Sequence, residues 1–341
     1  MINSRGELMI KRFAHVFIIL TLLCTSVQGQ EDAANSWYEK GNDLVGLGKY
    51  DEAVSAYDKA IEINPLFADA WFNRGFALKA QEKYDEAIKS YDQVLKINPH
   101  DSEAWNNRGI ALVVKGEYDQ AIKSYDKAIE INPEYALAWN NKGIALKDQG
   151  KYDEALKSYD KAIEADPKYA MAWYNKGVTF DAQGKYSEAI KSCDKALEIN
   201  PDLYSAWSNR GTVLYKLGKY NEAIESYDKA IGINPKDAEA WNNKGIAFKA
   251  QGKYDEAIKS YNNALEIDPQ YAQAWYTKGL ALNAQEKYDQ AIESFNKAIE
   301  INHQFGEAWY SKGASLKLLH RDAESKEAFA EAKNLGIEVP A

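Results

Sequence analysis

The sequence predicts an all-α protein, a solenoid of stacked antiparallel helix pairs, on three observations. Its nine tryptophans, from Trp37 to Trp309, are each separated from the next by 34 residues. A repeat of this size is too small to bury a core of its own, so consecutive repeats must stack to share one. The composition is rich in Ala, Lys, Glu, Tyr and Asn and poor in Val and Thr, which favours helix over strand. Seven of the eight prolines follow the same period.

The first 29 residues have the three-part layout of a secretory signal peptide. A basic region ends at Lys11-Arg12, an apolar run follows over 13–24, and small and polar residues lead to Gly29. The layout predicts cleavage after Gly29, which would place the chain outside the cytoplasmic membrane as a secreted, periplasmic or cell-surface protein. The run is shorter than the roughly 20 apolar residues of a usual spanning helix, so an uncleaved membrane tether through residues 13–24 is the alternative.

After a lead-in over 30–33, the chain divides into nine repeats of 34 residues. Their expected bounds are 34–67, 68–101, 102–135, 136–169, 170–203, 204–237, 238–271, 272–305 and 306–339. A first helix is expected around each tryptophan, and in six repeats a glycine eleven residues after the tryptophan is expected to end it in a left-handed conformation. A second helix starts near Tyr-Asp-Glu-Ala and stops before an Asn-Pro pair, because the residue before a proline resists the helical region.

The core of each repeat follows from helix geometry. At about 100° per residue, the tryptophan, the glycine four residues later and the apolar residue seven later share one face. Trp71, Gly75 and Leu78 are an example. A glycine within a helix costs up to about 1 kcal/mol relative to alanine, yet all nine repeats have one at this position. We expect it to allow close approach of the second helix, whose Ala87 and Tyr91 would fill the core.

The period, the tryptophan, the glycine, the Ala-x-x-x-Tyr pattern of Ala87 to Tyr91 and the closing proline together resemble the tetratricopeptide repeat family. The resemblance covers all nine repeats. It implies a right-handed superhelix of antiparallel helix pairs, whose first helices line an inner groove that binds peptides. The sequence departs from the family pattern at one recurring position. A Lys or Arg precedes the glycine in every repeat, from Lys40 to Lys312. We expect their stems to pack while their charges reach water. Polar substitutions in the last repeat predict a solubilising cap.

The face of the first helix opposite the tryptophan is the candidate binding surface. Two residues after the tryptophan, six successive repeats carry asparagine: Asn73, Asn107, Asn141, Asn175, Asn209 and Asn243. The series is similar to the asparagine ladder in the repeats of O-GlcNAc transferase, where the side chains hold a peptide backbone. An amide offers an acceptor and two donors, which match a main-chain N–H and C=O. Alternatively, these side chains are solvated, or repeat duplication copied a tolerated residue.

Apolar residues on the same face are further candidates for ligand contact. Phe76, Ile110, Ile144 and Val178 stand five residues after their tryptophans, and Tyr174 directly follows its own. Either these side chains pack between neighbouring first helices, or they form pockets for apolar groups of a ligand.

Charge and motif content disfavour other classes of function. The formal net charge of −9 argues against nonspecific binding to nucleic acid or acidic membranes. Four scattered histidines offer neither a metal site nor a catalytic triad, and no phosphate-binding glycine loop is present. Cys193, which replaces a tyrosine or phenylalanine, is expected to be a buried free thiol. The charged residues of the second helices are expected to form a solvated face.

The sequence therefore predicts a monomeric, non-enzymatic scaffold with no cofactor or metal. We expect it to bind a protein segment or peptide in extended form along its inner groove. Two alternatives stay open. One is a structural spacer or self-assembling array whose groove is empty, and the other is a groove that binds glycans through the tyrosines beside the tryptophans.

Overall fold

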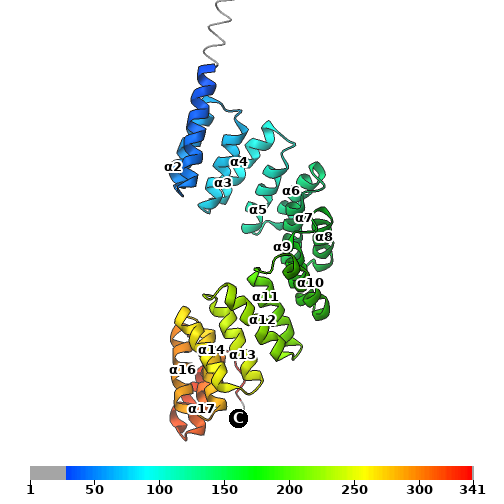
Figure 1. Ribbon diagram of the computed structural model, residues 1–341. Helices are drawn as coiled ribbons and strands as arrows, with labels where there is room; N and C mark the ends of the chain where they lie inside the picture. Colours follow the sequence, from blue (N-terminus) through cyan, green and yellow to red (C-terminus); the bar gives the residue numbers. More distant parts are fainter. Residues whose placement is uncertain (1–27, 340–341) are drawn as a thin grey trace, which may run out of the picture. The chain divides into compact units, whose positions relative to one another are not determined.

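The computed structural model describes residues 28–339, in which all regular structure is helical (Figure 1). The chain forms two compact units, Met1–Pro167 and Lys168–Ala341. Within the described residues the first unit contains four helix pairs and the second contains five. The predicted leader lies outside the described residues apart from its last two positions. Among residues 28–339, no helix is both long and apolar enough to cross a membrane.

The helices of residues 28–339 form consecutive pairs. The first helices span 28–46, α3 (Ala68–Ala80), α5 (Ser102–Val114), α7 (Ala136–Asp148), α9 (Ala170–Ala182), α11 (Tyr204–Lys216), α13 (Ala238–Ala250), α15 (Ala272–Ala284) and α17 (Gly306–Leu318). The second helices are α2 (Tyr50–Ile63), α4 (Tyr84–Ile97), α6 (Tyr118–Ile131), α8 (Tyr152–Ala165), α10 (Tyr186–Ile199), α12 (Tyr220–Ile233), α14 (Tyr254–Ile267), α16 (Tyr288–Ile301) and α18 (Asp322–Asn334). The helix over 28–46 begins earlier than expected, because no Asn-Pro pair precedes it.

Left-handed residues end the first helices. Glycine takes this conformation, with φ between +72° and +76°, at Gly48, Gly116, Gly150, Gly184, Gly218 and Gly252. The prediction for these six turns is confirmed. In the other three repeats Glu82, Glu286 and His320 take the same conformation, with φ of 61°, 59° and 58°. A side chain with a Cβ is strained there, so these three turns are less favourable than the glycine turns.

The core glycines allow the two helices of a repeat to approach closely. A Cβ placed on Gly143 would lie 2.5 Å from Cε1 of Tyr159, and Tyr159 is fully buried. The prediction that glycine is needed for close approach is therefore confirmed. The fifth repeat differs, because a Cβ on Gly177 would lie 3.0 Å from Sγ of Cys193. Cys193 is a buried free thiol, as predicted.

Within each unit the tryptophans lie between consecutive repeats, and their side chains are half-buried. Nε1 of Trp139 donates a hydrogen bond to the carbonyl of Pro133 at 2.9 Å. Nε1 of Trp309 donates the equivalent hydrogen bond to the carbonyl of His303 at 3.3 Å, although His303 replaces the proline. Each bond ties a first helix to the loop before it, and an indole N–H needs such a partner when it is partly buried.

The recurring cation before the core glycine also joins consecutive repeats. Nζ of Lys142 lies 5.4 Å from the ring centre of Trp139 and 2.6 Å from the carboxylate of Asp126 on α6. Arg108 makes the equivalent ion pair with Asp92 at 2.8 Å, and its side chain is 20% exposed. The stems of these side chains pack as expected, and their charged groups also pair with carboxylates that are partly exposed. The paired aspartates of the second helices are exposed as expected, with 41% of the Asp92 side chain and 49% of the Asp126 side chain accessible, and they also join consecutive repeats.

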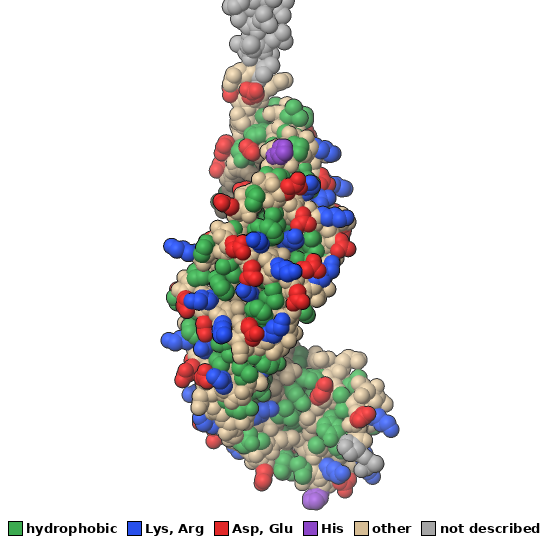
Figure 2. All heavy atoms as spheres, turned by 90° about the vertical axis from the view of Figure 1, so that its right-hand side faces the viewer, with side chains coloured by type: hydrophobic (Ala, Val, Ile, Leu, Met, Phe, Trp, Pro, Cys, Tyr) green, Lys and Arg blue, Asp and Glu red, His purple; other side chains and the backbone are tan. Residues whose placement is uncertain are grey.

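Contacts between helices identify the inner side of each unit. Neighbouring first helices contact one another, as α5 does with α7 and α13 does with α15. Among the described helices, no such contact joins second helices of neighbouring repeats. In a curved array, helices on the inside lie closer to one another than helices on the outside. The first helices therefore lie on the inner face of each unit. Basic and acidic side chains are interspersed with hydrophobic ones over the face shown in Figure 2.

Candidate functional site

Two asparagines of the first unit use their amides to join consecutive repeats. Nδ2 of Asn141 donates to Oδ1 of Asn106 at 3.0 Å, and Asn106 is 1% exposed. Nδ2 of Asn73 donates to Oδ1 of Asn42 at 2.9 Å and to the hydroxyl of Tyr38 at 3.2 Å. An amide has two donor hydrogens and an acceptor, so each such bond uses only part of its capacity. Part of the asparagine series is therefore explained by bonding within the array.

Phe76, Lys79 and Asn107 form a cluster on the inner face of the first unit. The Phe76 side chain is 42% exposed. Nζ of Lys79 lies 5.5 Å from the Phe76 ring centre and donates to Oδ1 of Asn107 at 3.0 Å. Burial lowers the pKa of Lys79. Sequence reasoning missed Lys79, although a lysine eight residues after the tryptophan, next to an apolar stripe, was a visible signal.

The other predicted apolar residues are used mainly for packing. Ile110 contacts the buried cluster that contains Leu112, and Ile144 contacts the cluster that contains Leu146. Both side chains are half-buried, as is Val178 in the second unit. Packing between neighbouring helices therefore accounts for much of their surface, and Phe76 is the most exposed of the four.

The three asparagines of the second unit have unequal surroundings. Nδ2 of Asn209 lies 3.5 Å from Sγ of Cys193. The backbone carbonyl of Asn175 accepts a hydrogen bond from Oγ1 of Thr179 at 2.8 Å. The Asn243 side chain makes no hydrogen bond to another residue in the described part of the chain. The six asparagines are therefore not equivalent rungs, and their role in ligand binding stays a prediction.

A polar pocket of about 570 Å³ lies on the inner face of the second unit. Tyr174 and Asn209, both predicted as site residues, line it. Ser208 and Thr212 of α11 and Glu239 of α13 also line it and were missed. The signal was present in the sixth repeat, where serine replaces the asparagine or aromatic residue that follows the other tryptophans. Thr212 likewise replaces the apolar residue of the neighbouring repeats.

The groups around this pocket suit polar recognition. The carboxylate of Asp237 accepts from the backbone N–H of Ala240 at 3.0 Å and so caps α13. The hydroxyls of Thr212 and Tyr227 are 3.2 Å apart. Burial raises the pKa of Tyr174, and a hydrogen bond with Ser205 partly opposes this shift. Hydroxyl, amide and carboxylate groups of this kind can bond to main-chain amides and to basic side chains.

Family models of the tetratricopeptide repeat match most of the repeat region. Those described as "Tetratricopeptide repeat" match 68–101, 102–135, 140–204, 192–225, 238–271 and 272–305, and one described as "TPR repeat" matches 41–82 and 211–252. The chain belongs to the tetratricopeptide repeat family, which confirms the resemblance seen in the sequence. The narrower likeness to the asparagine ladder of O-GlcNAc transferase is not tested by these matches.

Several solved structures are similar to the chain. "Crystal structure of YrrB: a TPR protein with an unusual peptide-binding site" is 31% identical, with 56% of this chain and 98% of that chain covered and a TM-score of 0.48. "Crystal structure of MamA" is 26% identical, with 48% and 96% covered and a TM-score of 0.45. "Crystal structure of APC/C hetero-tetramer Cut9-Hcn1" is 17% identical, with 89% and 73% covered and a TM-score of 0.55, a likeness in fold alone. No curated relative matched.

The protein is thus an α-helical solenoid of tetratricopeptide repeats. This scaffold supports interactions between proteins, and its members are generally not catalysts. Within residues 28–339, no group of three His, Cys, Asp or Glu side chains is placed to hold a metal ion.

Proposed function

We propose that the protein is a non-enzymatic scaffold that binds an extended peptide segment of a partner on its inner face. The observation that carries the proposal is the polar pocket of about 570 Å³ in the second unit. An extended segment presents an unpaired N–H and C=O at each residue. The amide of Asn209 and the hydroxyls of Ser208 and Thr212 offer both donors and acceptors to such a segment.

The charges of the pocket favour a segment with a basic residue. Asp237 is used to cap α13, whereas Glu239 is exposed and forms no ion pair with another described residue. Lys236 is the basic residue that lines the pocket. A ligand lysine or arginine would complement Glu239 while the tyrosine rings of Tyr174 and Tyr204 flank the segment.

The first unit offers a separate contact of different chemistry. Phe76 is an exposed ring beside the half-buried ammonium of Lys79. An apolar side chain of a ligand would cover the ring, and burial of such a group stabilises a complex by about 1.5–3 kcal/mol. The asparagines contribute hydrogen bonds of about 0.5–1.5 kcal/mol each, so several contacts must act together.

The test is a selection of short peptides from a displayed library on the full chain. Selected peptides are then measured by fluorescence anisotropy against Ser208→Trp, which fills the pocket from an inner-face position. We expect affinity to fall at least about tenfold, which corresponds to about 1.4 kcal/mol. Lys229→Ala, on the exposed side of α12, is the matched control and should leave affinity unchanged. Equal binding to both variants would show that the pocket is not the site.

Two further measurements separate the alternatives. Light scattering that shows concentration-dependent oligomers, with no selected peptide, would favour a self-assembling array or spacer over the expected monomer. Binding on a glycan array without peptide binding would favour the glycan alternative.

We also propose that the scaffold acts outside the cytoplasmic membrane, on the basis of the leader alone. The intact mass of the protein from its native host tests this, because loss of residues 1–29 is expected. A mass that retains the leader in a membrane fraction would support the tether through residues 13–24.

A further inference from the structure

On the outer side of each unit, an ion pair closes the junction between consecutive repeats. The cation before the core glycine pairs with an aspartate of the preceding second helix at 2.5–2.8 Å. These pairs are Arg74–Asp58, Arg108–Asp92, Lys142–Asp126, Arg210–Asp194 and Lys244–Asp228. The cation also lies over the ring of its tryptophan, at 5.1 Å for Lys244. In each case a half-buried positive charge has a carboxylate partner.

The junctions before the eighth and ninth repeats lack this ion pair in the described residues. Asn262 of α14 stands where the earlier junctions have aspartate, and Asn296 of α16 takes the same position at the next junction. Nζ of Lys278 lies 5.0 Å from the ring centre of Trp275, but it makes no ion pair with a carboxylate in the described residues. Burial lowers the pKa of Lys278, and the charge of Glu293 partly opposes this shift. This direction is expected for a half-buried ammonium without a close counter-ion.

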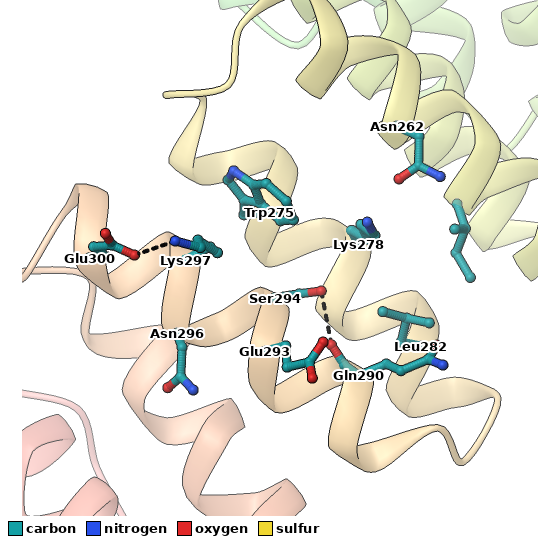
Figure 3. A pocket seen from close by; sticks show the side chains of 11 residues that line it. Asn262, Trp275, Lys278, Leu282, Gln290, Glu293, Ser294, Asn296, Lys297 and Glu300 are labelled. Atoms are coloured by element: carbon teal, nitrogen blue, oxygen red, sulfur yellow. Dashed lines mark hydrogen bonds and ion pairs between the residues drawn. The ribbon is translucent and has the colours of Figure 1, made fainter.

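A pocket opens at this junction between α14 and α16, with α15 as its floor. Figure 3 shows Lys278 between Asn262 on one side and Ser294 and Glu293 on the other. The pocket has a volume of about 820 Å³. The equivalent pocket beside Lys142, where the aspartate pair is present, has a volume of about 470 Å³. The junction at Lys278, which lacks the carboxylate, is therefore also more open than the junction at Lys142.

Apart from Glu293, the remaining groups of the pocket are already engaged or neutral. Lys297 pairs with Glu300 at 2.7 Å, and the hydroxyl of Ser294 donates to the backbone carbonyl of Gln290 at 3.0 Å. Glu293 is exposed at the rim and forms no ion pair in the described residues. Lys278 is thus the one deep cation in this pocket, and Glu293 is the group that would compete with an incoming anion.

We propose that this outer pocket of the second unit binds an aspartate or glutamate side chain of a partner polypeptide. The ligand carboxylate takes the place that Asp126 and its equivalents occupy at the junctions that have the ion pair. Trp275, Leu282 and Ile258 provide apolar surface for the residues beside it. A charge-assisted hydrogen bond to a partly buried ammonium is among the stronger polar contacts. This site is separate from the inner face and does not depend on the function proposed for it.

The experiment selects short displayed peptides that bind the full chain but not the Asn262→Asp variant. This substitution restores the carboxylate of the earlier junctions with little change in volume. We expect the selected peptides to share an acidic residue. Changing that residue to its amide, or Asn262 to aspartate, should weaken binding about tenfold, the effect of one charge-assisted bond. Glu293→Gln should strengthen binding, because a competing carboxylate is removed.

A reciprocal variant keeps the test independent of folding. Asp126→Asn frees Lys142 at the equivalent junction of the first unit, and it should create a second site for the same peptides. Ser208→Trp on the inner face should leave their binding unchanged, which separates this proposal from the inner-face function. Selected peptides without an acidic residue, or peptides that bind Asn262→Asp equally well, would overturn the proposal. If free glutamate binds and no acidic peptide does, the proposal that the ligand is part of a polypeptide is wrong.

Discussion

The inner faces of the two units are built from the same helix positions but present different chemistry. In the first unit, Phe76, Ile110 and Ile144 make an apolar stripe. In the second, Ser208 and Thr212 line a polar pocket. The hydrogen bond from tryptophan to the carbonyl of the preceding loop recurs in both units. Positions that never vary between repeats therefore specify the array, and positions that vary specify what each unit can bind.

The largest expected effect concerns the core glycine, whose neighbour is Tyr159 at Gly143 in the first unit and Cys193 at Gly177 in the second. In Gly143→Ala the new Cβ meets the Tyr159 ring at 2.5 Å, and we expect the free energy of unfolding to fall by about 3 kcal/mol. In Gly177→Ala the nearest atoms are Sγ of Cys193 at 3.0 Å and the carbonyl oxygen of Ala189 at 3.2 Å. The helix preference for alanine, worth up to about 1 kcal/mol, offsets much of that cost.

Urea unfolding followed by circular dichroism measures both variants. Because repeat arrays do not always unfold in one step, midpoints of each transition should be compared as well as total free energies. Equal losses in the two variants would show that Cys193 gives no more room than Tyr159.

The second prediction concerns alkaline pH and is specific to the second unit. Burial raises the pKa of Cys193 from 9.0 to about 11. Between pH 9 and 11 the thiol stays neutral in the folded state but ionises in the unfolded state. The stability that the neutral thiol contributes is therefore fully present below pH 9 and is lost as the pH rises to about 11. The loss should reach about 2 kcal/mol, since one pKa unit corresponds to about 1.4 kcal/mol.

Cys193→Ala is the control for this titration. Buried tyrosines of both units ionise at higher pH, as the pKa of about 12 for Tyr57 in the first unit and for Tyr227 in the second indicates. They therefore contribute equally to the wild type and to the variant. If the difference in unfolding free energy between the two proteins does not change from pH 9 to 11, the thiol is not held neutral.

The fold could be predicted from the sequence because the repeat is a local pattern. Tryptophan, glycine and proline at a fixed period set the helix ends and the close contact of each pair. The ion pair of Lys142 with Asp126 could not be predicted, because it joins residues of different repeats. The bond from Asn141 to Asn106 was hidden for the same reason. The polar pocket was visible only as departures of Ser208 and Thr212 from their neighbours.

The third prediction separates structural asparagines from candidate ligand contacts. Asn141→Ala removes the donor to Oδ1 of Asn106, which is 1% exposed, so a buried acceptor loses its partner. We expect a loss of about 1–2 kcal/mol in the free energy of unfolding. Asn243→Ala removes no such bond and should leave stability within about 0.5 kcal/mol of wild type. A ligand test on the asparagine series should therefore begin with Asn243, whose effects on folding and binding do not overlap.

The smallest expected effect is a gain in stability that should be the same in both units. Glu82 in the first unit and Glu286 in the second have φ of 61° and 59°, where six other repeats have glycine. Glycine reaches this conformation without the steric cost of a Cβ, although it loses more entropy on folding. Glu82→Gly and Glu286→Gly should each raise the free energy of unfolding by about 0.5–1 kcal/mol. Thermal unfolding of both variants measures this gain, with Glu62→Gly in the helical part of α2 as a control that should be destabilised. A gain in one unit alone would show that the turns, like the inner faces, differ between the two units.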